Sequence, residues 1–452
     1  MKGAESMKKS FLTVILSLSF VVFFSLSVFS AEFPGPDAAK IDWNQSNGQS
    51  IRVMACSRDA ITYLKNIVPE FEKLTGIKVA IDDYPEAEFF RKIIIDLSSG
   101  NPVSDVFMLS HAYSTMYEAG GWLEPLEPYL ENSSLTDKAW YDFEDYPAGS
   151  LSAVVINGKL YGIPIAPDNQ IVFYRKDLFE EAGLLYPNNM DELYDDAVKL
   201  NNPPNHAGVV LRLARGAGTH WPWNGYIQNY GGSWLNTETK RPELDTPQVI
   251  AGTEMYLKLL KDAGPAGAVN YSWYEASSDF AQGKAAIFAG DANIFMSSFE
   301  DPSRSQVAGK VAYALLPPAP DGNNAPAAGT AWHWGMSSVS KSKEAGWLFI
   351  QWATSKDIAL RLGIDTTEIM RNSIWQSETL KNKYPTVPDW IEASSATMNQ
   401  FSGLYRFPRV KEFGPLADIV EALLQEMFLG QISVADGMAK AQAQTLEVMK
   451  ME

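Results

Sequence analysis

The chain has 452 residues, of which 46% are hydrophobic and 20% are charged, and its formal net charge is −17. At about 100–200 residues per domain, this length indicates two or three domains with substantial cores. The acidic surface repels nucleic acid and anionic lipid, which excludes nucleic-acid binding through a basic face and favours a monomer. The single cysteine, Cys56, excludes an internal disulfide.

The first thirty residues have the layout of a secretory signal peptide. Three lysines precede an apolar run over residues 11–29, and Val28 and Ser30 fit the −3 and −1 positions of a cleavage site. The sequence therefore predicts a signal peptide over 1–30, cleavage after Ser30 and a periplasmic mature protein with a net charge near −19. An uncleaved membrane anchor is the alternative, since the run approaches the length that spans a bilayer.

The stretch VMAC at 53–56 imitates a lipoprotein-processing site, in which the cysteine becomes the lipidated N-terminus. Cys56 lies well beyond the apolar run, however, and the charged Arg52 stands between them. We therefore interpret residues 51–56 as a strand, and we expect no lipid anchor.

Strand-like apolar runs alternate with amphipathic helical stretches in the first part of the mature chain. Strands are predicted at 51–56, 78–84 and 105–109, and helices at 59–76 and 86–100, each helix ending in a glycine. This alternation indicates βαβ units and a parallel sheet with helices on both faces. In such sheets, ligands bind beyond the carboxyl ends of the strands. That rim would carry Ser57, Arg58, Asp59, Asp83, Tyr84, Ser110 and His111.

The middle of the chain carries the signs of a passage into a second domain. The turn pair Asn157-Gly158 lies between apolar runs and is followed by Gly-Ile-Pro at 162–164. Further on, residues 311–318 and the stretch from Trp332 predict a returning pair of strands. The C-terminal part is mostly helical, and Ser433 is the predicted N-cap of the last helix.

No sequence motif points to catalysis or to a bound metal. The chain contains no HExxH, no GxSxG, no Walker-type GxxxxGK[ST] and no GxGxxG that opens a helix. Four histidines and one cysteine leave little material for a zinc site. The 54 acidic residues can always supply a carboxylate pair for glycoside cleavage, so that signal is uninformative. We therefore expect no catalytic residue, no metal and no cofactor.

Tryptophan is concentrated in four short stretches that are rich in glycine, proline, asparagine or serine. They are HWPW (220–223), GGSW (231–234), YSWY (271–274) and AWHW (331–334). An aromatic face stacks on the C–H face of a sugar ring, and neighbouring polar groups bond its hydroxyls. The clusters therefore favour a carbohydrate or polyol cleft, although each tryptophan taken alone fits a core position equally well.

Seven motifs follow one another from about residue 50 to the C-terminus. They are VPEFEKLTGIKV, LSSGNPVSDVF, AGGWLEPLEPYL, NGKLYGIPI with FYRKDLFEEAGL, FAQGKAAIFAG, SKSKEAGWLFIQWATS and LGQISVADGMAKAQ. In this order they resemble the bacterial extracellular solute-binding proteins of ABC importers, in the carbohydrate-binding group that includes maltose-binding protein.

The resemblance implies a two-lobed α/β fold of the periplasmic-binding-protein type, with a ligand cleft between the lobes and three hinge crossings. Closure of the cleft traps the ligand, and a membrane permease recognises the closed form. The crossings are expected near 163–167, 289–293 and 337–341. Lobe one would comprise 50–164 and 290–339, and lobe two 166–288 and 342–452.

By position, the resemblance also implies ligand contacts from the rim of lobe one, from the crossings and from aromatic residues that open lobe-two helices. The expected ligand-binding residues are Arg58, Asp59, Asp83, His111, Asp168, Asn169, Trp221, Trp223, Trp273, Asp291, Trp332, Trp334, Arg371 and Arg406. Asp59 fits a helix N-cap as well, and one of Trp332 and Trp334 is expected to face the core. Arg371 lacks the family's more usual Pro-x-Arg neighbourhood, and Trp234 is expected in the core.

The leading hypothesis is a non-enzymatic receptor that binds a sugar, an oligosaccharide or a sugar alcohol and delivers it to an ABC permease. A secreted carbohydrate-active enzyme is the alternative from another class. A third possibility keeps the receptor but exchanges the ligand for a phosphorylated polyol or a polyamine. Arg58, Arg371 and Arg406 together in the cleft would favour an anion, whereas arginines held in salt bridges would favour a neutral sugar.

Overall fold

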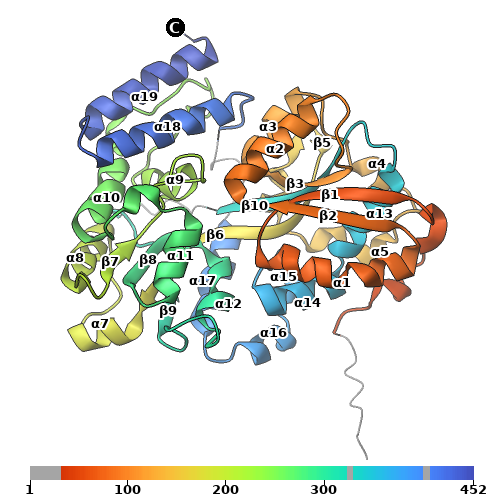
Figure 1. Ribbon diagram of the computed structural model, residues 1–452, viewed down its shortest axis with the longest axis horizontal. Coiled ribbons are helices and arrows are strands. Elements are labelled where there is room, and N and C mark those ends of the chain that lie inside the picture. Colours follow the sequence, from red (N-terminus) through yellow and green to blue (C-terminus); the bar gives the residue numbers. More distant parts are fainter. Residues whose placement is uncertain (1–31, 323–328, 401–407, 452) are drawn as a thin grey trace, which may run out of the picture.

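The computed structural model describes residues 32–322, 329–400 and 408–451, and its two α/β lobes lie side by side (Figure 1). One eight-stranded sheet runs through both lobes in the order β2-β1-β3-β10-β6-β8-β7, with β9 paired to β6. The strands are β1 (Ser50–Cys56), β2 (Lys78–Tyr84), β3 (Val106–Ser110), β6 (Ile163–Arg175), β7 (Ala207–Val210), β8 (Ala285–Ala292), β9 (Val311–Ala314) and β10 (Gly329–Met336). The predicted two-lobed α/β fold is confirmed.

Lobe one is built on three parallel strands, because β1 pairs with both β2 and β3 in parallel. The strand predicted at 78–84 coincides with β2. The first helix ends where predicted, since Gly76 adopts a φ of 70° that glycine tolerates without strain. The lobe-one helices are α1 (Asp59–Thr75), α2 (Glu86–Ser98), α3 (His111–Ala119), α4 (Glu127–Leu130), α5 (Lys138–Tyr141), α6 (Ala148–Ser152), α13 (Lys343–Ala353) and α14 (Lys356–Thr366).

Lobe two is built on β7, β8, β9 and the second half of β6. β7 and β8 are parallel, whereas β6 is antiparallel to β8 and β9. Stacked aromatic rings fill part of its core, with Phe173 and Phe288 at a centroid distance of 5.7 Å. Its helices are α7 (Lys176–Ala182), α8 (Met190–Leu200), α9 (His220–Asn229), α10 (Pro247–Ala263), α11 (Trp273–Ala281), α12 (Met296–Phe299), α17 (Pro388–Gln400), α18 (Phe413–Phe428) and α19 (Val434–Met449).

The long strand β6 is the first connection between the lobes. Its first half, from Ile163 to Asn169, pairs with β10 of lobe one, and its second half, from Gln170 onward, pairs with β8 and β9 of lobe two. The predicted crossing near 163–167 therefore lies within a continuous strand. This arrangement places the residues at the middle of β6 between the two lobes (Figure 1).

The packing of two segments departs from the expected lobe boundaries. After β8 the chain stays with lobe two, because Phe295, Phe299 and Tyr313 share a core cluster with Phe173. Conversely, the apolar stripe of α13 packs into the core of lobe one, where Phe349 lies edge-on to Trp334. The second crossing thus follows β9, and the third follows α14.

Several smaller predictions are confirmed by local geometry. Residues Asn157 and Gly158 form the turn of a hairpin between β4 (Val155–Ile156) and β5 (Lys159–Leu160), both with positive φ. The Ser433 side chain accepts a hydrogen bond from the Asp436 backbone N–H at the start of α19. The remaining short elements are α15 (Asn372–Trp375), α16 (Glu378–Lys383) and the 3₁₀ segments η1 (Pro36–Ala38), η2 (Trp43–Ser46), η3 (Phe143–Asp145), η4 (Ala268–Asn270) and η5 (Asn293–Phe295).

Over the described ranges, every helix is too short or too polar to cross a membrane. The predicted signal peptide at 1–30 lies outside the described residues.

Candidate ligand-binding pocket

A pocket lies between the two lobes at the carboxyl ends of β1 and β3, beside the middle of β6. Its empty space measures about 640 Å³, including space that is open to solvent. We call it the interlobe pocket. It is lined by Cys56, Ser57, Arg58, Glu86, Phe90, Ser110, Ala112, Tyr113, Asp168, Arg212, Gly218, His220, Trp221, Trp273, Ala292, Ile294, Phe295 and Trp332.

The Arg58 guanidinium is held on the lobe-one side of the pocket by two carboxylates. Arg58 lies two residues after the end of β1 and directly before α1, which places it at the carboxyl edge of the sheet. Its Nη2 lies 2.8 Å from Asp168 of β6, and its Nε lies 2.8 Å from Glu368. Burial opposes the charge, but the two carboxylates outweigh it and raise the pKa of Arg58 above its ordinary value.

A second buried arginine, Arg212, lies on the lobe-two side. It follows β7, and its Nε donates to Asp291 of β8 at 2.7 Å. Its Nη1 also lies 4.0 Å from Glu86, the first residue of α2 in lobe one. Burial raises the pKa of the Glu86 carboxyl, and the charge of Arg212 opposes that rise.

Three indoles form aromatic walls around this polar centre. Trp332 stacks on Phe90 at a centroid distance of 5.7 Å, and its Nε1 donates to Asp168 at 2.7 Å. Trp221 lies under the Arg212 guanidinium at 5.0 Å, and its buried Nε1 has no hydrogen-bond partner among the described residues. Trp273 opens α11 and lies half-buried on the lobe-two side. A bound molecule with an acceptor oxygen would satisfy the Trp221 N–H.

The two guanidinium charges of the pocket are matched by carboxylates of the protein. Both guanidinium groups have carboxylate partners at or within 4.0 Å, so neither is an unpaired cation that calls for an anionic ligand. The open groups are carboxylate, hydroxyl and indole N–H groups beside flat aromatic faces. This arrangement can bond several hydroxyl groups of a neutral ligand and cover its C–H groups.

Five of the residues predicted from the sequence come together in this pocket. They are Arg58, Asp168, Trp221, Trp273 and Trp332. A sixth, Asp291, is fully buried behind the lining and bonds Arg212.

Two predicted tryptophans lie in the cores instead. On α9, Trp221 and Trp223 are two residues apart and point about 200° apart around the helix axis. Trp221 therefore faces the pocket, while Trp223 is fully buried, donates to Thr253 Oγ1 at 2.9 Å and packs against Trp234 at 5.1 Å. Trp334 is buried against Phe349, which agrees with the expectation that one residue of the β10 pair faces the core.

Arg371 does not line the interlobe pocket. Its guanidinium is fully buried under lobe one and donates to the carbonyl oxygens of Thr354, Asp142 and Tyr141 at 2.8, 2.9 and 3.0 Å. It therefore has a structural environment, and its position corrects the expectation of a ligand contact. Arg406 lies outside the described residues.

Four further predicted residues lie near the rim without lining the pocket. Asp59 is the first residue of α1, not its N-cap, and it pairs with Arg304 of lobe two at 3.0 Å. Asp83 accepts a hydrogen bond from Ser57 and pairs with Lys65. His111 is buried at the start of α3, and the Asn169 side chain donates to the Ser394 carbonyl at 3.4 Å.

Sequence reasoning missed Glu86, Arg212 and the pair formed by His220 and Glu421. Glu86 follows β2 and Arg212 follows β7, so a stricter use of the carboxyl-edge rule would have found both. His220 lines the pocket, and its Nδ1 lies 2.7 Å from Glu421 of α18. That pair joins segments 201 residues apart, so no local pattern reveals it. Within the described ranges, no cluster of three or more His, Cys, Asp or Glu could hold a metal ion.

Comparison with known proteins identifies the family. The chain matches the model for "Bacterial extracellular solute-binding protein" over residues 57–359. The erythritol/L-threitol-binding protein of Mycolicibacterium smegmatis is 30% identical over 330 residues, which cover 70% of this chain and 69% of that protein. The mannitol-binding protein of Pseudomonas aeruginosa is 27% identical over 379 residues, which cover 80% and 84%.

A solved structure extends the agreement to three dimensions. An ABC transporter solute-binding protein from Agrobacterium radiobacter, in complex with ribitol, has a TM-score of 0.82 at 25% identity and covers 89% of this chain and 99% of its own. The resemblance noted in the sequence is thus confirmed at the level of fold and of family. By its sequence match and its two lobes around a central pocket, the chain belongs to the bacterial extracellular solute-binding proteins, the receptors of ABC importers.

Proposed function

We propose that this receptor binds a neutral, acyclic polyol of about four to six carbons in the interlobe pocket and presents it to a membrane permease. The observation that carries the proposal is a pocket walled by indoles in which both described guanidinium groups are already paired with carboxylates. Arg58 and Arg212 are each neutralised by carboxylates, and Trp221, Trp273 and Trp332 surround them. The named ligands of three relatives, erythritol or L-threitol, mannitol and ribitol, support the same ligand class.

Each pocket group has a role in this proposal. Glu86 and Asp168 accept hydrogen bonds from ligand hydroxyls, and the Trp221 N–H donates one. The indole faces cover the C–H groups of the carbon chain. Of the expected ligand contacts, Asp59, Asp83, His111, Asn169, Trp223, Trp334 and Arg371 have no direct role here, because none of them lines the interlobe pocket.

The proposal includes a periplasmic monomer, released from its leader by cleavage after Ser30, that binds its ligand without altering it. The family's extracellular location and the relatives, which are binding proteins, support this. A phosphorylated polyol is disfavoured, because Arg58 and Arg212, the two arginines among the described lining residues, are already paired with carboxylates.

A thermal-shift panel tests the ligand class. Erythritol, ribitol, D-mannitol, maltose and glycerol 3-phosphate are compared at equal concentrations, with product analysis of each mixture. A ligand at one hundred times its Kd adds about 2.7 kcal/mol to the free energy of unfolding. We expect at least one alditol to raise Tm by several degrees, and we expect product analysis to recover that alditol unchanged. The proposal would be contradicted if only maltose or only glycerol 3-phosphate raised Tm, or if any of the compounds were chemically converted.

A further inference from the structure

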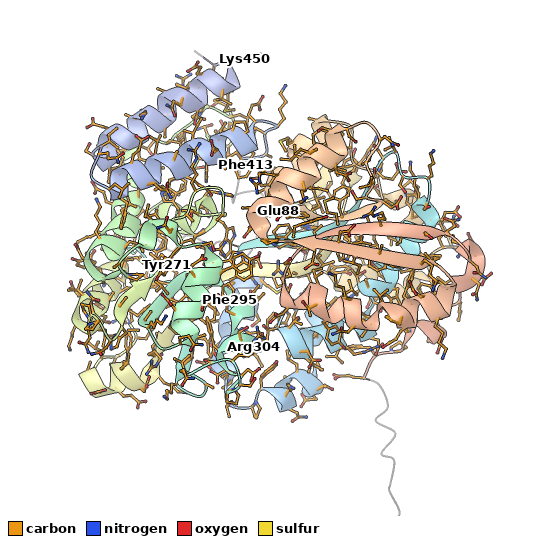
Figure 2. The ribbon with its side chains drawn as sticks, in the orientation of Figure 1. Glu88, Tyr271, Phe295, Arg304, Phe413 and Lys450 are labelled. Carbon is orange, nitrogen blue, oxygen red and sulfur yellow. The ribbon has the colours of Figure 1, made fainter. Side chains whose placement is uncertain are left out.

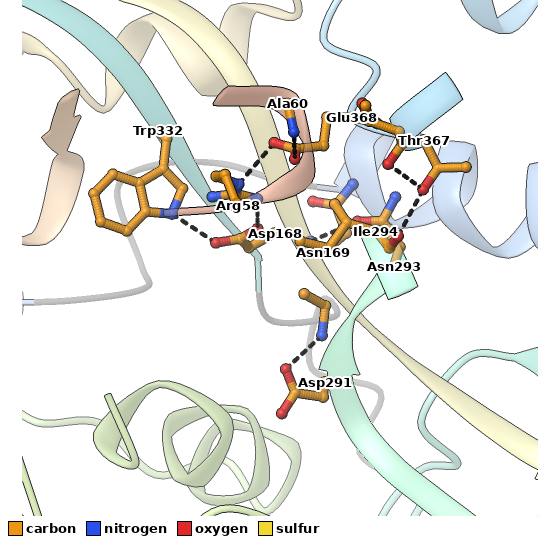
Figure 3. A network of polar contacts seen from close by, with 12 residues as sticks. Arg58, Ala60, Asp168, Asn169, Asp291, Asn293, Ile294, Trp332, Thr367 and Glu368 are labelled. Carbon is orange, nitrogen blue, oxygen red and sulfur yellow. Dashed lines mark hydrogen bonds and ion pairs between the residues drawn. The ribbon is translucent and has the colours of Figure 1, made fainter. Parts of the chain in front are cut away.

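The connections between the lobes converge on one group of polar contacts around Arg58 (Figure 3). Asp168 belongs to β6, the first connection, and accepts hydrogen bonds from Arg58 and from Trp332 of β10, the strand that follows the second. Glu368 lies just after α14, at the third connection between the lobes, and it contacts the same guanidinium. The Arg58 guanidinium therefore joins the first and the third connection between the lobes.

Glu368 has an unusual position in this group. Its side chain is only 1% exposed and does not line the interlobe pocket, yet its Oε2 lies 2.8 Å from Arg58 Nε. Its Oε1 also accepts a hydrogen bond from the Ala60 N–H at 3.2 Å, in the first turn of α1. The Glu368 carboxylate thus pairs with Arg58 Nε on the side away from the interlobe pocket, while Asp168 accepts a hydrogen bond from Nη2 on the pocket side.

We propose that Glu368 is a positioning residue: its ionised carboxylate fixes the Arg58 guanidinium in the interlobe pocket and thereby makes ligand affinity depend on pH near neutrality. This inference rests on the proposed function, since it concerns the affinity of the same pocket. It adds a residue that no ligand touches and a condition under which the receptor binds.

The surroundings of Glu368 support a change of charge in this range. Burial raises the pKa of Glu368 to about 7; the charge of Arg58 opposes the rise, and that of Asp168 adds to it. Cys56 at the end of β1 is a neutral neighbour, because burial raises the pKa of its thiol well above the ordinary value. The other charged groups on the cavities that Glu368 lines are Asp59 and Arg304, which pair with each other, and Arg371, which bonds backbone carbonyls.

The sign of the effect follows from these contacts. Above pH 7 the ionised Glu368 holds Arg58 Nε, so the guanidinium is fixed by two carboxylates. Below pH 7 Glu368 takes up a proton, its attraction for Arg58 is lost and only Asp168 holds the guanidinium. Arg58 in turn holds Asp168, which accepts a hydrogen bond from the ligand in the proposed function. Since the ionised Glu368 keeps this pair in place for the ligand, affinity falls as pH decreases.

Titration calorimetry with erythritol, ribitol and D-mannitol between pH 6 and pH 8 tests the inference. For the wild-type protein we expect the Kd of the bound alditol to rise about tenfold from pH 8 to pH 6, since about ten in eleven molecules are protonated one unit below a pKa of 7. Glu368→Gln should bind at least tenfold more weakly at pH 8, with a flat pH profile. Glu368→Asp, which keeps the charge, should retain a pH dependence.

Asp357→Asn is the matched control, because Asp357 lies on α14, is itself partly buried and lines none of the described pockets. We expect it to keep the wild-type profile, and the Tm of every variant is measured at pH 8. A flat wild-type profile, or a Glu368→Gln profile equal to that of the wild type, would overturn the inference and leave the proposed function standing. Failure of the wild type to bind any alditol at any pH would overturn both.

Discussion

Arg212 of lobe two reaches across the interlobe pocket to Glu86 of lobe one, with Nη1 and Oε2 4.0 Å apart. Arg212 is fixed on its own side by Asp291, so any movement of the lobes changes its distance to Glu86. The distance between the two charged groups therefore depends on how far the lobes are closed, and both groups line the interlobe pocket. We expect changes at this pair to alter ligand affinity more than stability.

Glu86→Gln should weaken alditol binding about tenfold. The Glu86 charge attracts Arg212, and it also strengthens the hydrogen bonds from ligand hydroxyls. The variant loses this charge, and charge-assisted hydrogen bonds contribute about 1.5–3 kcal/mol. Calorimetry at pH 7.5 measures the change in Kd. Glu88→Gln is the control on the same helix (Figure 2), since the Glu88 side chain is 42% exposed and pairs with Lys92 one turn further on. Equal affinities of the two variants would contradict a role for Glu86.

Trp221→Ala and Trp223→Ala should differ in their effect on binding. Trp221 faces the pocket, so its removal should cost at least tenfold in alditol affinity; because its ring is also buried, Tm should decrease as well. Trp223 is fully buried between Thr253 and Trp234, so its removal should lower the free energy of unfolding by about 3–5 kcal/mol. Urea denaturation and calorimetry on both variants check this. If Trp223→Ala abolished binding in a fully stable protein, the placement of α9 would be wrong.

Arg371→Met should destabilise the protein without weakening the pocket. The change leaves three buried carbonyl oxygens without their donor, and removing one partner of a buried charged group costs about 3–5 kcal/mol. Arg361→Met, which removes a partly exposed guanidinium paired with Glu70, should cost less than about 1 kcal/mol. Denaturant unfolding measures both. Loss of alditol binding by a folded Arg371→Met protein would return Arg371 to the ligand site.

His333 should make the protein less stable in acid. Burial lowers the pKa of His333 to about 4, whereas an unfolded histidine titrates near 6.5. Between these values the unfolded chain holds a proton that the folded chain does not, so the free energy of unfolding falls as pH decreases from about 6.5 to about 4.

The contribution of one proton is at most about 1.4 kcal/mol per pH unit. His333→Gln removes the titrating group, and we expect its unfolding free energy to depend less steeply on pH over this window. Urea denaturation at several pH values measures the slopes, with His206→Gln, at a partly exposed histidine, as the control. Identical slopes for His333→Gln and the wild type would contradict the prediction.

Local patterns predicted the elements of the fold well. The strand at 78–84 and the helix that ends at Gly76 follow from residue spacing and from the left-handed cap, both of which act over a few residues. The lobe boundaries were less accessible, because the apolar stripe of α13 is compatible with either core. Which core it fills depends on its packing against β1 and α1, which lie far earlier in the chain.

The pocket could be predicted only in part, for a similar reason. Arg58 and Trp332 follow from the ends of strands and from an aromatic cluster. Their partners do not, because Glu368 reaches Arg58 from a segment 310 positions later in the chain. Trp223 was expected to bind ligand because it stands next to Trp221 in an aromatic cluster. Two residues apart on a helix, however, the two rings point to different sides, and only Trp221 faces the pocket.

The continuous course of β6 has a mechanical consequence. The strand β6 contributes hydrogen bonds to β10 in lobe one and to β8 and β9 in lobe two. Unfolding of the sheet in either lobe therefore disturbs a strand on which the other lobe also depends. The two lobes should therefore melt together in a single calorimetric transition, and a ligand seated beside Asp168 should shift that transition as a whole. We expect closure of the cleft to bend the single sheet that both lobes share, and the bound ligand to stabilise the closed form.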